Sequence, residues 1–428
     1  MFKVGIISLG CAKNRVDSEQ IMAFLDKNEF EFVLDPNAAD IIIINTCGFI
    51  DDAKQESIDT IFEMLEYKKI LVVTGCLVER YKEVLEKEIG EVDLYVSISD
   101  YPRFNELLSN VINKKLNGEI IRGDRYLSTE PYTAFLKISE GCNNRCHYCA
   151  IPLIRGGFRS FPFFDLIEEA KKIASLGVKE LVVISQDTTR YGEDLSPKRD
   201  IVELLKELLK IEEFSYIRLL YLYPDEISDE LIELIAKEER LTPYFDIPIQ
   251  HSEDNVLLSM NRRGNKEFLI NLFKKIREKV PNAILRTTLI VGYPSESKSD
   301  FEALCEFIKE VEFDHLGVFT YSPEEGTVGA TLKQITKRIK ESRKEKIMQI
   351  QSEISLRRNQ RFLNEKMHGI VTGFDEEKGA YTVRNFFNAP DEIDGNIYVY
   401  AVSLYELGET INFKVVDVST YDLYCEEL

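Results

Sequence analysis

Residues 140–149 read EGCNNRCHYC, which places Cys142, Cys146 and Cys149 within eight positions of the chain. Three thiolates can hold three irons of a four-iron cluster and leave the fourth iron open to an outside ligand, as a catalytic zinc keeps one position free. The alternative is a zinc knuckle, but a closed zinc site needs a fourth Cys or a His at ligand spacing, and His147 lies between two of the thiols. The segment therefore favours an iron–sulfur centre that performs chemistry.

The chain on the carboxyl side of this segment alternates apolar runs with helical patterns, which predicts parallel strands joined by crossover helices. We expect six strands, at residues 133–139, 180–185, 216–221, 244–249, 284–291 and 315–320. Six units are two fewer than a closed eight-stranded barrel contains. The pattern alone is compatible with a partial barrel or with a complete barrel of which two units are missed.

Three further cysteines follow strand patterns in the first part of the chain. Apolar, β-branched runs occupy residues 3–8, 40–45 and 70–74, and Cys11, Cys47 and Cys76 follow them in turn. Because the loops after parallel strands share the carboxyl edge of a sheet, where ligands bind, we expect the three thiols to meet at one edge. Each of them taken alone would also fit a small buried side chain.

The composition describes an ordered globular chain of 428 residues with 44% hydrophobic residues and a net charge of −20. No apolar run reaches the roughly eighteen residues that a transmembrane helix needs, and no signal-peptide pattern precedes the first strand, so we expect a cytoplasmic protein. Eight cysteines in such a chain indicate ligands or buried thiols rather than disulfides. The acidic balance argues against a general affinity for nucleic acid and favours a basic partner.

The last part of the chain changes pattern after a predicted helix at 334–361. Short alternating strands at 369–372, 381–383, 397–402 and 411–418, divided by turns that contain glycine, predict a small antiparallel barrel. From residue 363 to 428, thirteen Asp and Glu residues stand against four Lys and Arg residues. Such a module should repel phosphate and attract a basic protein, and we expect Asp391, Glu392 and Asp394 to contribute to that attraction.

The spacing of Cys142, Cys146 and Cys149 resembles that of the radical S-adenosylmethionine (SAM) superfamily, in which SAM binds the open iron. The segments LGCAKNRVDSE (9–19), NTCGFIDDAKQES (45–57) and TGCL (74–77) resemble the methylthiotransferase family. More narrowly, they are similar to the branch that modifies an aspartate of the twelfth small-subunit ribosomal protein. The resemblance covers essentially the whole chain. It implies an α/β fold with an N-terminal parallel α/β domain (1–124), a partial (βα)6 TIM-like radical SAM barrel (128–360) and a small antiparallel β-barrel, the TRAM domain (361–428).

The resemblance also implies SAM and two 4Fe-4S clusters as cofactors. The implied ligands are Cys142, Cys146 and Cys149 for one cluster and Cys11, Cys47 and Cys76 for the other. Strand ends would hold SAM, through Gln186 and Asp187 after the second strand and Ile290 and Gly292 at the fifth. The alternative for Gln186 and Asp187 is that they only cap the loop after the second strand. A glycine at position 292 fits a need for close backbone approach to a ligand. Arg155 and Arg159, which follow the cysteine segment, remain available for a carboxylate of SAM or of the substrate.

The implied reaction adds a methylthio group to the β-carbon of an aspartate. Because a β C–H has no useful acidity, a base cannot open it, whereas a carbon radical can take the hydrogen atom. The resemblance implies that one SAM supplies this radical and that another SAM methylates sulfur on the first-domain cluster. We expect a basic small-subunit ribosomal protein as substrate, a reductant such as flavodoxin or ferredoxin, a monomeric chain, and neither a membrane nor a nucleic acid as partner. Two alternatives stay open: a tRNA methylthiotransferase of the same fold, and a non-catalytic iron–sulfur electron carrier, which would not cleave SAM.

Overall fold

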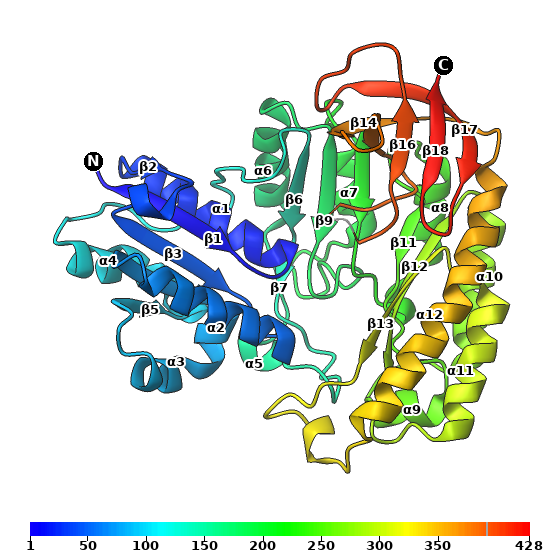
Figure 1. The fold of residues 1–428 in the computed structure, drawn as a ribbon, viewed down its shortest axis with the longest axis horizontal. Helices are drawn as coiled ribbons and strands as arrows, with labels where there is room; N and C mark the ends of the chain where they lie inside the picture. The colour runs from blue at the N-terminus through cyan, green and yellow to red at the C-terminus, as the bar shows by residue number, and fades with distance from the viewer. Residues whose placement is uncertain (391–392) are drawn as a thin grey trace.

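The computed structural model describes residues 1–390 and 393–428, and three parts follow one another along the chain (Figure 1). The first part is a five-stranded parallel sheet with the strand order β2-β1-β3-β4-β5. The central strand has the sequence IIIINT and is buried along its whole length, as expected for a parallel sheet covered on both faces. The strands are β1 (Lys3–Ser8), β2 (Glu31–Phe32), β3 (Ile41–Thr46), β4 (Ile70–Gly75) and β5 (Leu94–Val96).

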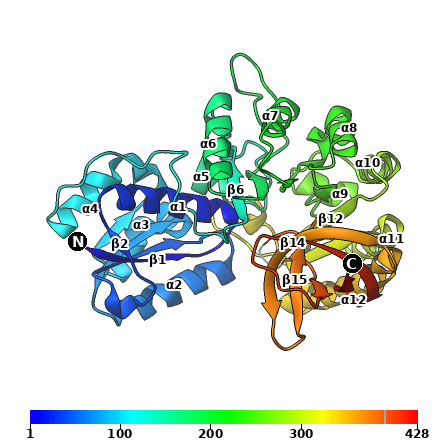
Figure 2. The same ribbon diagram turned by 90° about the horizontal axis from the view of Figure 1, so that it is seen from above.

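Four helices cover the two faces of this sheet, two on each face. Apolar side chains of α1 (Ala12–Lys27) and α4 (Phe104–Ile112) pack on one face. Those of α2 (Asp51–Leu65) and α3 (Cys76–Glu88) pack on the other. Figure 2 shows α1 and α2 on opposite sides of the sheet. Apolar side chains therefore cover both faces of the sheet, and its polar loops lie at the ends of its strands.

The second part contains the six predicted strands, which form two parallel three-stranded sheets, β6-β9-β10 and β11-β12-β13. The backbone joins them, because Ile217 N donates to Arg240 O at 2.7 Å and Leu222 N donates to Asp246 O at 2.9 Å. The prediction of a partial barrel is confirmed, with β6 and β13 at its two edges. Its strands are β6 (Thr133–Lys137), β9 (Glu180–Ile184), β10 (Tyr216–Leu219), β11 (Tyr244–Asp246), β12 (Ile284–Val291) and β13 (His315–Thr320).

Helices line the outside of the partial barrel (Figure 1). Their starts follow ordinary capping chemistry: Ser297 and Asp300 form a capping box at the start of α11. The helices of this part are α5 (Ile151–Arg155), α6 (Phe163–Ser175), α7 (Ile201–Leu208), α8 (Asp229–Lys237), α9 (Asp254–Ser259), α10 (Lys266–Lys279) and α11 (Lys298–Val311). The short α5 is not on the outside but packs against α3 of the first part. A short antiparallel pair, β7 (Ser139–Glu140) with β8 (Arg159–Ser160), frames the cysteine segment. No helix among residues 1–390 and 393–428 is long and apolar enough to cross a membrane.

The third part follows the long helix α12 (Lys337–Asn359) and is a closed barrel with the order β14-β15-β16-β18-β17, called the C-terminal barrel below. Closure is as predicted, but two details differ. The strand β18 was not predicted from the sequence. It pairs in parallel with β16, so the barrel is not purely antiparallel. Its strands are β14 (Lys366–Asp375), β15 (Ala380–Arg384), β16 (Ile397–Tyr400), β17 (Thr410–Val418) and β18 (Leu423–Glu427).

The C-terminal barrel closes the amino end of the partial barrel. Phe387 is fully buried and shares one apolar cluster with Phe135, Val182 and Tyr244 inside the partial barrel. Polar contacts reinforce the junction: Arg218, wholly buried, donates to Asn385 O at 2.5 Å. The two barrels therefore share a core, and the carboxyl ends of the six strands remain as the end where a reaction can take place.

Asp394 belongs to this junction, and its expected role in attracting a partner at the surface is wrong. Its side chain is 1% exposed, accepts a hydrogen bond from Tyr244 Oη at 2.6 Å and lies 3.6 Å from Arg286 Nε. A carboxylate held in this way takes part in the contact between the barrels and is hidden from a partner. Asp391 and Glu392, which were expected to act with it, lie outside the described residues.

Candidate functional site

The first cysteine trio, Cys11, Cys47 and Cys76, meets at the carboxyl edge of the first sheet. Cys11 is the N-cap of α1 beyond β1, Cys47 directly follows β3, and Cys76 is the first residue of α3 after β4. These three strands are neighbours in the sheet, so the expectation of one shared edge is met. The loops pack closely: a Cβ on Gly10 would lie 2.7 Å from Cys47 Cβ, and one on Gly48 would lie 2.7 Å from Leu77 N.

A buried asparagine fixes the loops that carry this trio. Asn14 Nδ2 donates to Leu9 O at 2.8 Å and to Thr46 O at 3.1 Å, so α1 is tied to the ends of β1 and β3. Asn45 donates in turn to Asn14 O and to Ser18 Oγ, both at 2.8 Å. Because these side chains satisfy backbone groups at two strand ends, the positions of the thiols are set by a network rather than by one loop.

The electrostatics of the first cysteine trio suit a ligand that brings positive charge. Burial raises the pKa of the Cys47 thiol to about 11, and burial also raises the pKa of Cys76 although Arg155 opposes it. Two of the three thiols lie at helix starts, α1 and α3, whose N-terminal partial charge favours a thiolate. Metal binding would thus displace protons from these thiols and make thiolates of them.

The second cysteine trio, Cys142, Cys146 and Cys149, lies in the loop after β7, at the carboxyl end of the partial barrel. Gly141 has a φ of +74°, and a Cβ there would lie 2.2 Å from Gly157 O, so only glycine fits. The loop is pinned by Cys142 N, which donates to Gly156 O at 3.2 Å. Burial raises the pKa of Cys142 and of Cys149, and the proximity of Cys146 raises both pKa values further.

The zinc alternative for this loop depends on how closely possible ligands group. His147 Nδ1 lies 2.8 Å from the carbonyl oxygen of Ser259, which can only accept, so that nitrogen carries a proton and only Nε2 is left for a metal. Among residues 1–390 and 393–428, no three His, Cys, Asp or Glu side chains group tightly enough to hold a single metal ion. Three thiols that bind three different irons of one cluster need no such tight grouping. All eight cysteines are free thiols, as predicted.

Gln186 and Asp187 follow β9 beside the second cysteine trio, and they differ in whether their side-chain oxygens already have hydrogen-bond partners. Asp187 is buried and engaged: its carboxylate accepts from Asn144 Nδ2 at 2.7 Å, from Arg190 Nε at 3.3 Å and from Thr189 Oγ1 at 3.1 Å. Gln186 Nε2 donates to Glu140 Oε1 at 2.9 Å, but its Oε1 is a buried acceptor without a partner. An orphan acceptor of this kind fits an ammonium donor from a ligand.

Ile290 and Gly292 lie at the end of β12. Ile290 packs in the cluster that also contains Tyr148 of the cysteine loop, and Ile290 N donates to Gln250 O at 2.8 Å. Gly292 has a φ of +74°, and a Cβ there would lie 2.4 Å from the side chain of Lys340. The backbone conformation and the close approach of α12 thus explain why residue 292 is a glycine. The sequence had suggested a different reason, namely contact with a ligand.

The carboxyl edges of the two parts face each other, which brings the two cysteine trios to one interface. Arg155, six residues after Cys149, donates from Nη2 to Cys76 Sγ at 3.2 Å and from Nη1 to Asp17 Oδ2 at 2.6 Å. Cys76 also packs against Ala150, the residue next to Cys149. Arg155 therefore bonds to residues of the first domain and is not free for a carboxylate of SAM or of the substrate, as the sequence had suggested. Arg159 is exposed.

A buried ion network at this interface was not foreseen from the sequence. Lys137, the last residue of β6, bonds to Asp17 of α1 and to Glu140 at 2.8 Å, and Arg155 lies 3.5 Å from Glu140. A signal was available in α1, because Lys13, Asn14 and Asp17 occupy positions that a helix on a sheet usually fills with apolar residues. Polar residues on a buried face of a helix indicate that a polar surface of another element packs against that face.

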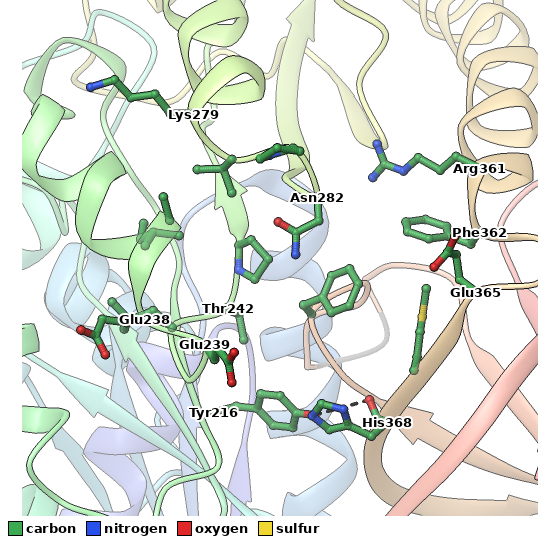
Figure 3. A pocket seen from close by; sticks show the side chains of 18 of the residues that line it. Tyr216, Glu238, Glu239, Thr242, Lys279, Asn282, Arg361, Phe362, Glu365 and His368 are labelled. Atoms are coloured by element: carbon green, nitrogen blue, oxygen red, sulfur yellow. Dashed lines mark hydrogen bonds between the residues drawn. The ribbon is translucent and has the colours of Figure 1, made fainter. Parts of the chain in front are cut away.

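One cavity of the molecule lies away from both cysteine trios. A cavity of about 700 Å³ lies between the amino end of the partial barrel and the C-terminal barrel, where Tyr216 Oη donates to His368 O at 3.4 Å (Figure 3). Its charged lining includes Lys279, Arg361 and Glu365. Because it opens at the amino ends of the strands, it is not where a barrel of this kind performs chemistry.

A second cavity, of about 510 Å³, starts at Gly10 beside the first cysteine trio. It passes Phe135 on β6 and ends among C-terminal barrel residues such as Thr372 and Arg384. It therefore joins the neighbourhood of Cys11 to the C-terminal barrel along the β6 edge of the partial barrel.

Comparison with known proteins agrees with this division of the chain. Residues 3–97 match the model of the Uncharacterized protein family UPF0004, residues 136–308 match the Radical SAM superfamily, and residues 365–427 match the TRAM domain. Among solved structures, the radical SAM methyltransferase TsrM from Kitasatospora setae superposes with a TM-score of 0.56 at 13% identity over 77% of both chains. The cobalamin-dependent SAM radical enzyme OxsB gives a TM-score of 0.53 at 12% identity, over 82% of this chain and 56% of the other. These likenesses show the fold.

Sequence relatives are much more similar and extend over almost the whole chain. The protein named ribosomal protein uS12 methylthiotransferase RimO of Acetivibrio thermocellus is 46% identical over 99% of this chain and 98% of its own. Proteins of the same name from Aquifex aeolicus and Clostridioides difficile are 47% and 44% identical, over 98% and 99% of this chain and 96% and 98% of their own. The chain therefore belongs to the ribosomal protein uS12 methylthiotransferase RimO family, and it is a radical SAM methylthiotransferase.

Proposed function

We propose that this enzyme transfers a methylthio group to the β-carbon of an aspartate in the twelfth small-subunit ribosomal protein. The observation that carries the proposal is the contact between the first cysteine trio and the segment that follows the second, through Cys76 and Arg155. A substrate carbon that first loses a hydrogen atom and then receives sulfur has to reach both sites without leaving the enzyme. Two cysteine trios on facing strand edges satisfy that requirement in one chain.

The second cysteine trio would hold a 4Fe-4S cluster together with SAM, and these groups supply a carbon radical when they are bound. The chain's own contribution is placement. Gln186 Oε1, the orphan buried acceptor, would receive the ammonium group of SAM. Asp187 would act indirectly, because its carboxylate accepts a hydrogen bond from Asn144 and so helps to position the cysteine loop. Ile290 and Gly292 would lie against the adenine side, with Ile290 in the same cluster as Tyr148.

The first cysteine trio would hold a second 4Fe-4S cluster, which supplies the sulfur that is transferred. Arg155 would donate a hydrogen bond to one of its thiolate ligands, Cys76. The amino ends of α1 and α3 would add favourable partial charge at Cys11 and Cys76. Asn14 and Asn45 keep these loops in place, so the site needs little reorganisation when the cluster binds.

The choice of a ribosomal protein over tRNA rests on charge. The C-terminal barrel exposes Glu376, Glu377, Glu406 and Glu426 and carries few basic residues, so it favours a Lys- and Arg-rich protein and disfavours a phosphate backbone. The cavity of about 510 Å³ that runs from this barrel to Gly10 offers the substrate a path to the first cysteine trio. We further propose that the enzyme acts as a monomer in the cytoplasm with a reductant such as flavodoxin or ferredoxin.

The test uses full-length protein with clusters reconstituted anaerobically, SAM and a strong reductant. Two substrates are compared: a peptide that contains the target aspartate of the ribosomal protein, and tRNA. Tandem mass spectrometry should find methylthio mass on the aspartate of the peptide and none on tRNA. Methylthio mass on tRNA alone would move the enzyme to the tRNA-modifying branch, and SAM consumption without any product on either substrate would contradict the proposal.

A further inference from the structure

Lys13 is a buried lysine that crosses from the first domain to the partial barrel. It lies in the first turn of α1, two residues after Cys11, and only 8% of it is exposed. Its Nζ lies 3.2 Å from the centroid of the Tyr221 ring and 3.5 Å from Ser185 O. Ser185 follows β9 and Tyr221 follows β10, so the ammonium group sits at the carboxyl ends of two barrel strands and beside the first cysteine trio.

The charges around Lys13 do not balance. Lys137 and Arg155 share the two carboxylates of the interface, Asp17 and Glu140. Asp17, one helical turn from Lys13, is thus already engaged by two cations. Among residues 1–390 and 393–428, no carboxylate lies within ion-pair distance of Lys13 Nζ, whose contacts are the long hydrogen bond to Ser185 and the Tyr221 ring. A buried ammonium without a carboxylate partner is disfavoured, so Lys13 favours a ligand that brings a carboxylate to this site.

Hydrogen bonds on both sides hold the backbone of Tyr221, the residue whose ring lies against Lys13. Tyr221 has a φ of +63°, a conformation that bulky residues rarely adopt. Its N donates to Asp246 Oδ2 at 2.9 Å, and its O accepts from Thr188 N at 3.2 Å. A strained residue that is fixed on both sides and carries its ring against a lysine is typical of a ligand-binding site. A cation–π contact also leaves the ammonium hydrogens that point away from the ring available for an acceptor.

We propose that Lys13 binds the side-chain carboxylate of the aspartate that is modified, which makes it a specificity-determining residue. The inference rests on the proposed function, because it requires an aspartate substrate. The carboxylate is one bond from the β-carbon, so a cation beside Cys11 places that carbon near the first cysteine trio. Lys13 thus distinguishes aspartate from asparagine, whose neutral amide would leave the buried charge unpaired.

The experiment measures binding of two peptides to the full-length, cluster-loaded protein in the absence of reductant. The peptides span the segment of the ribosomal protein around the modified position and carry Asp or Asn there. Wild type should prefer the Asp peptide. Lys13→Met and Lys13→Gln, of which the second can still donate to Ser185, should each weaken binding of the Asp peptide by about 30-fold and leave the Asn peptide unchanged. Lys13→Arg should retain most of the preference.

Controls separate this role from others. Lys114→Met removes a lysine that lies 5.1 Å from the Phe30 ring in the same domain, and it should change neither peptide's affinity. Equal weakening of both peptides by Lys13→Met would overturn the inference. So would a preserved Asp preference together with a changed affinity for SAM, or with a shifted reduction potential of the first cluster, because Lys13 would then serve SAM or the cluster. Wild type that binds neither peptide would instead contradict the proposed function.

Discussion

Arg155 shows how one side chain can connect two sites. Its guanidinium donates to Cys76 Sγ at 3.2 Å with one arm and to Asp17 at 2.6 Å with the other, and both contacts are buried. The planar fork of arginine suits such a double contact, which lysine cannot reproduce. Arg155 therefore positions Cys76, the proposed cluster ligand, while it ties α1 to the loop that follows the second cysteine trio.

We predict that Arg155→Lys lowers the reduction potential of the first-domain cluster. A hydrogen bond to a cluster sulfur stabilises the reduced state, so its loss should make that cluster harder to reduce. A redox titration followed by electron paramagnetic resonance would measure this potential. The potential of the other cluster serves as the internal control and should stay unchanged. Equal shifts at both clusters would show a general disturbance of the interface and contradict the specific role.

The six cysteines allow the two sites to be separated. Reconstituted wild type should contain about eight irons per chain, four in each cluster. Cys142→Ala should lose about half of the iron and all SAM cleavage. Cys47→Ala should also lose about half of the iron but keep SAM cleavage without substrate, because the second cysteine trio is in a different domain. Iron analysis and chromatography of 5'-deoxyadenosine check this, and Cys305→Ala, a core cysteine of α11, is the control. An unchanged iron content in Cys47→Ala would remove the first cysteine trio from cluster binding.

At the level of elements, the contact between the two barrels matters most. The charge pattern suggested a separable recognition module, but Phe387 and Asp394 lie in a core that the C-terminal barrel shares with β6, β9 and β11. Deletion of residues 363–428 would expose apolar side chains such as Phe135 and Val182. We therefore expect such a deletion to destabilise the partial barrel, and SAM cleavage by the truncated protein would not survive intact.

A substitution tests the shared core without the deletion. Phe387→Ala should lower the free energy of unfolding by about 3–5 kcal/mol, because it leaves a cavity at a fully buried position. Phe374→Ala in the same barrel, where the ring is 54% exposed, should change it by about 0.5 kcal/mol or less. Urea unfolding of metal-free protein, followed by circular dichroism, gives both values. Similar small losses for the two variants would mean that the barrels fold independently.

Glu427 provides a pH-dependent test on the strand β18. Hydrogen bonds from Ser403 and Tyr405 lower its pKa to about 2. A carboxyl group whose pKa is lower in the folded state adds stability above its unfolded pKa, about 4.3, and loses that contribution as the pH falls towards 2. Glu427→Gln should therefore reduce the stability of metal-free protein at pH 7 and narrow the difference from wild type near pH 2. Unfolding curves at several pH values measure this, and a constant difference would contradict it.

For the whole molecule, sequence reasoning succeeded where the signal is local. Cysteine spacing and apolar runs are short-range patterns, so both cysteine trios and the six strands of the partial barrel were predictable. It failed where a residue's environment depends on a distant segment. Asp394 is acidic, and composition alone placed it on the surface, although Tyr244 and Arg286 bury it. Lys13, Asp17 and Lys137 were not recognised as an interface because their neighbours are more than 100 residues apart in the chain.

The acidic surface should act as a steering field over the whole molecule. We predict that neutralising Glu376, Glu377 and Glu406 together as Gln weakens binding of the ribosomal protein several-fold at low salt and has little effect at high salt, because screening removes the field beyond about 10 Å at 0.1 M. The matched control neutralises Glu86, Glu88 and Glu91 on the N-terminal domain, where the same charge change should matter less. Binding that is indifferent to salt and to the C-terminal acids would place recognition at the edge of the partial barrel.

The most direct test of the central claim is the mass of the cellular products. Ribosomal proteins and tRNA from a strain that lacks the gene would be compared by mass spectrometry with those from strains that carry wild type or Cys47→Ala. We expect methylthio mass on one aspartate of the twelfth small-subunit protein only with wild type, and tRNA methylthio content that is equal in all three strains. Loss of methylthio groups from tRNA with an unchanged ribosomal protein would contradict the claim.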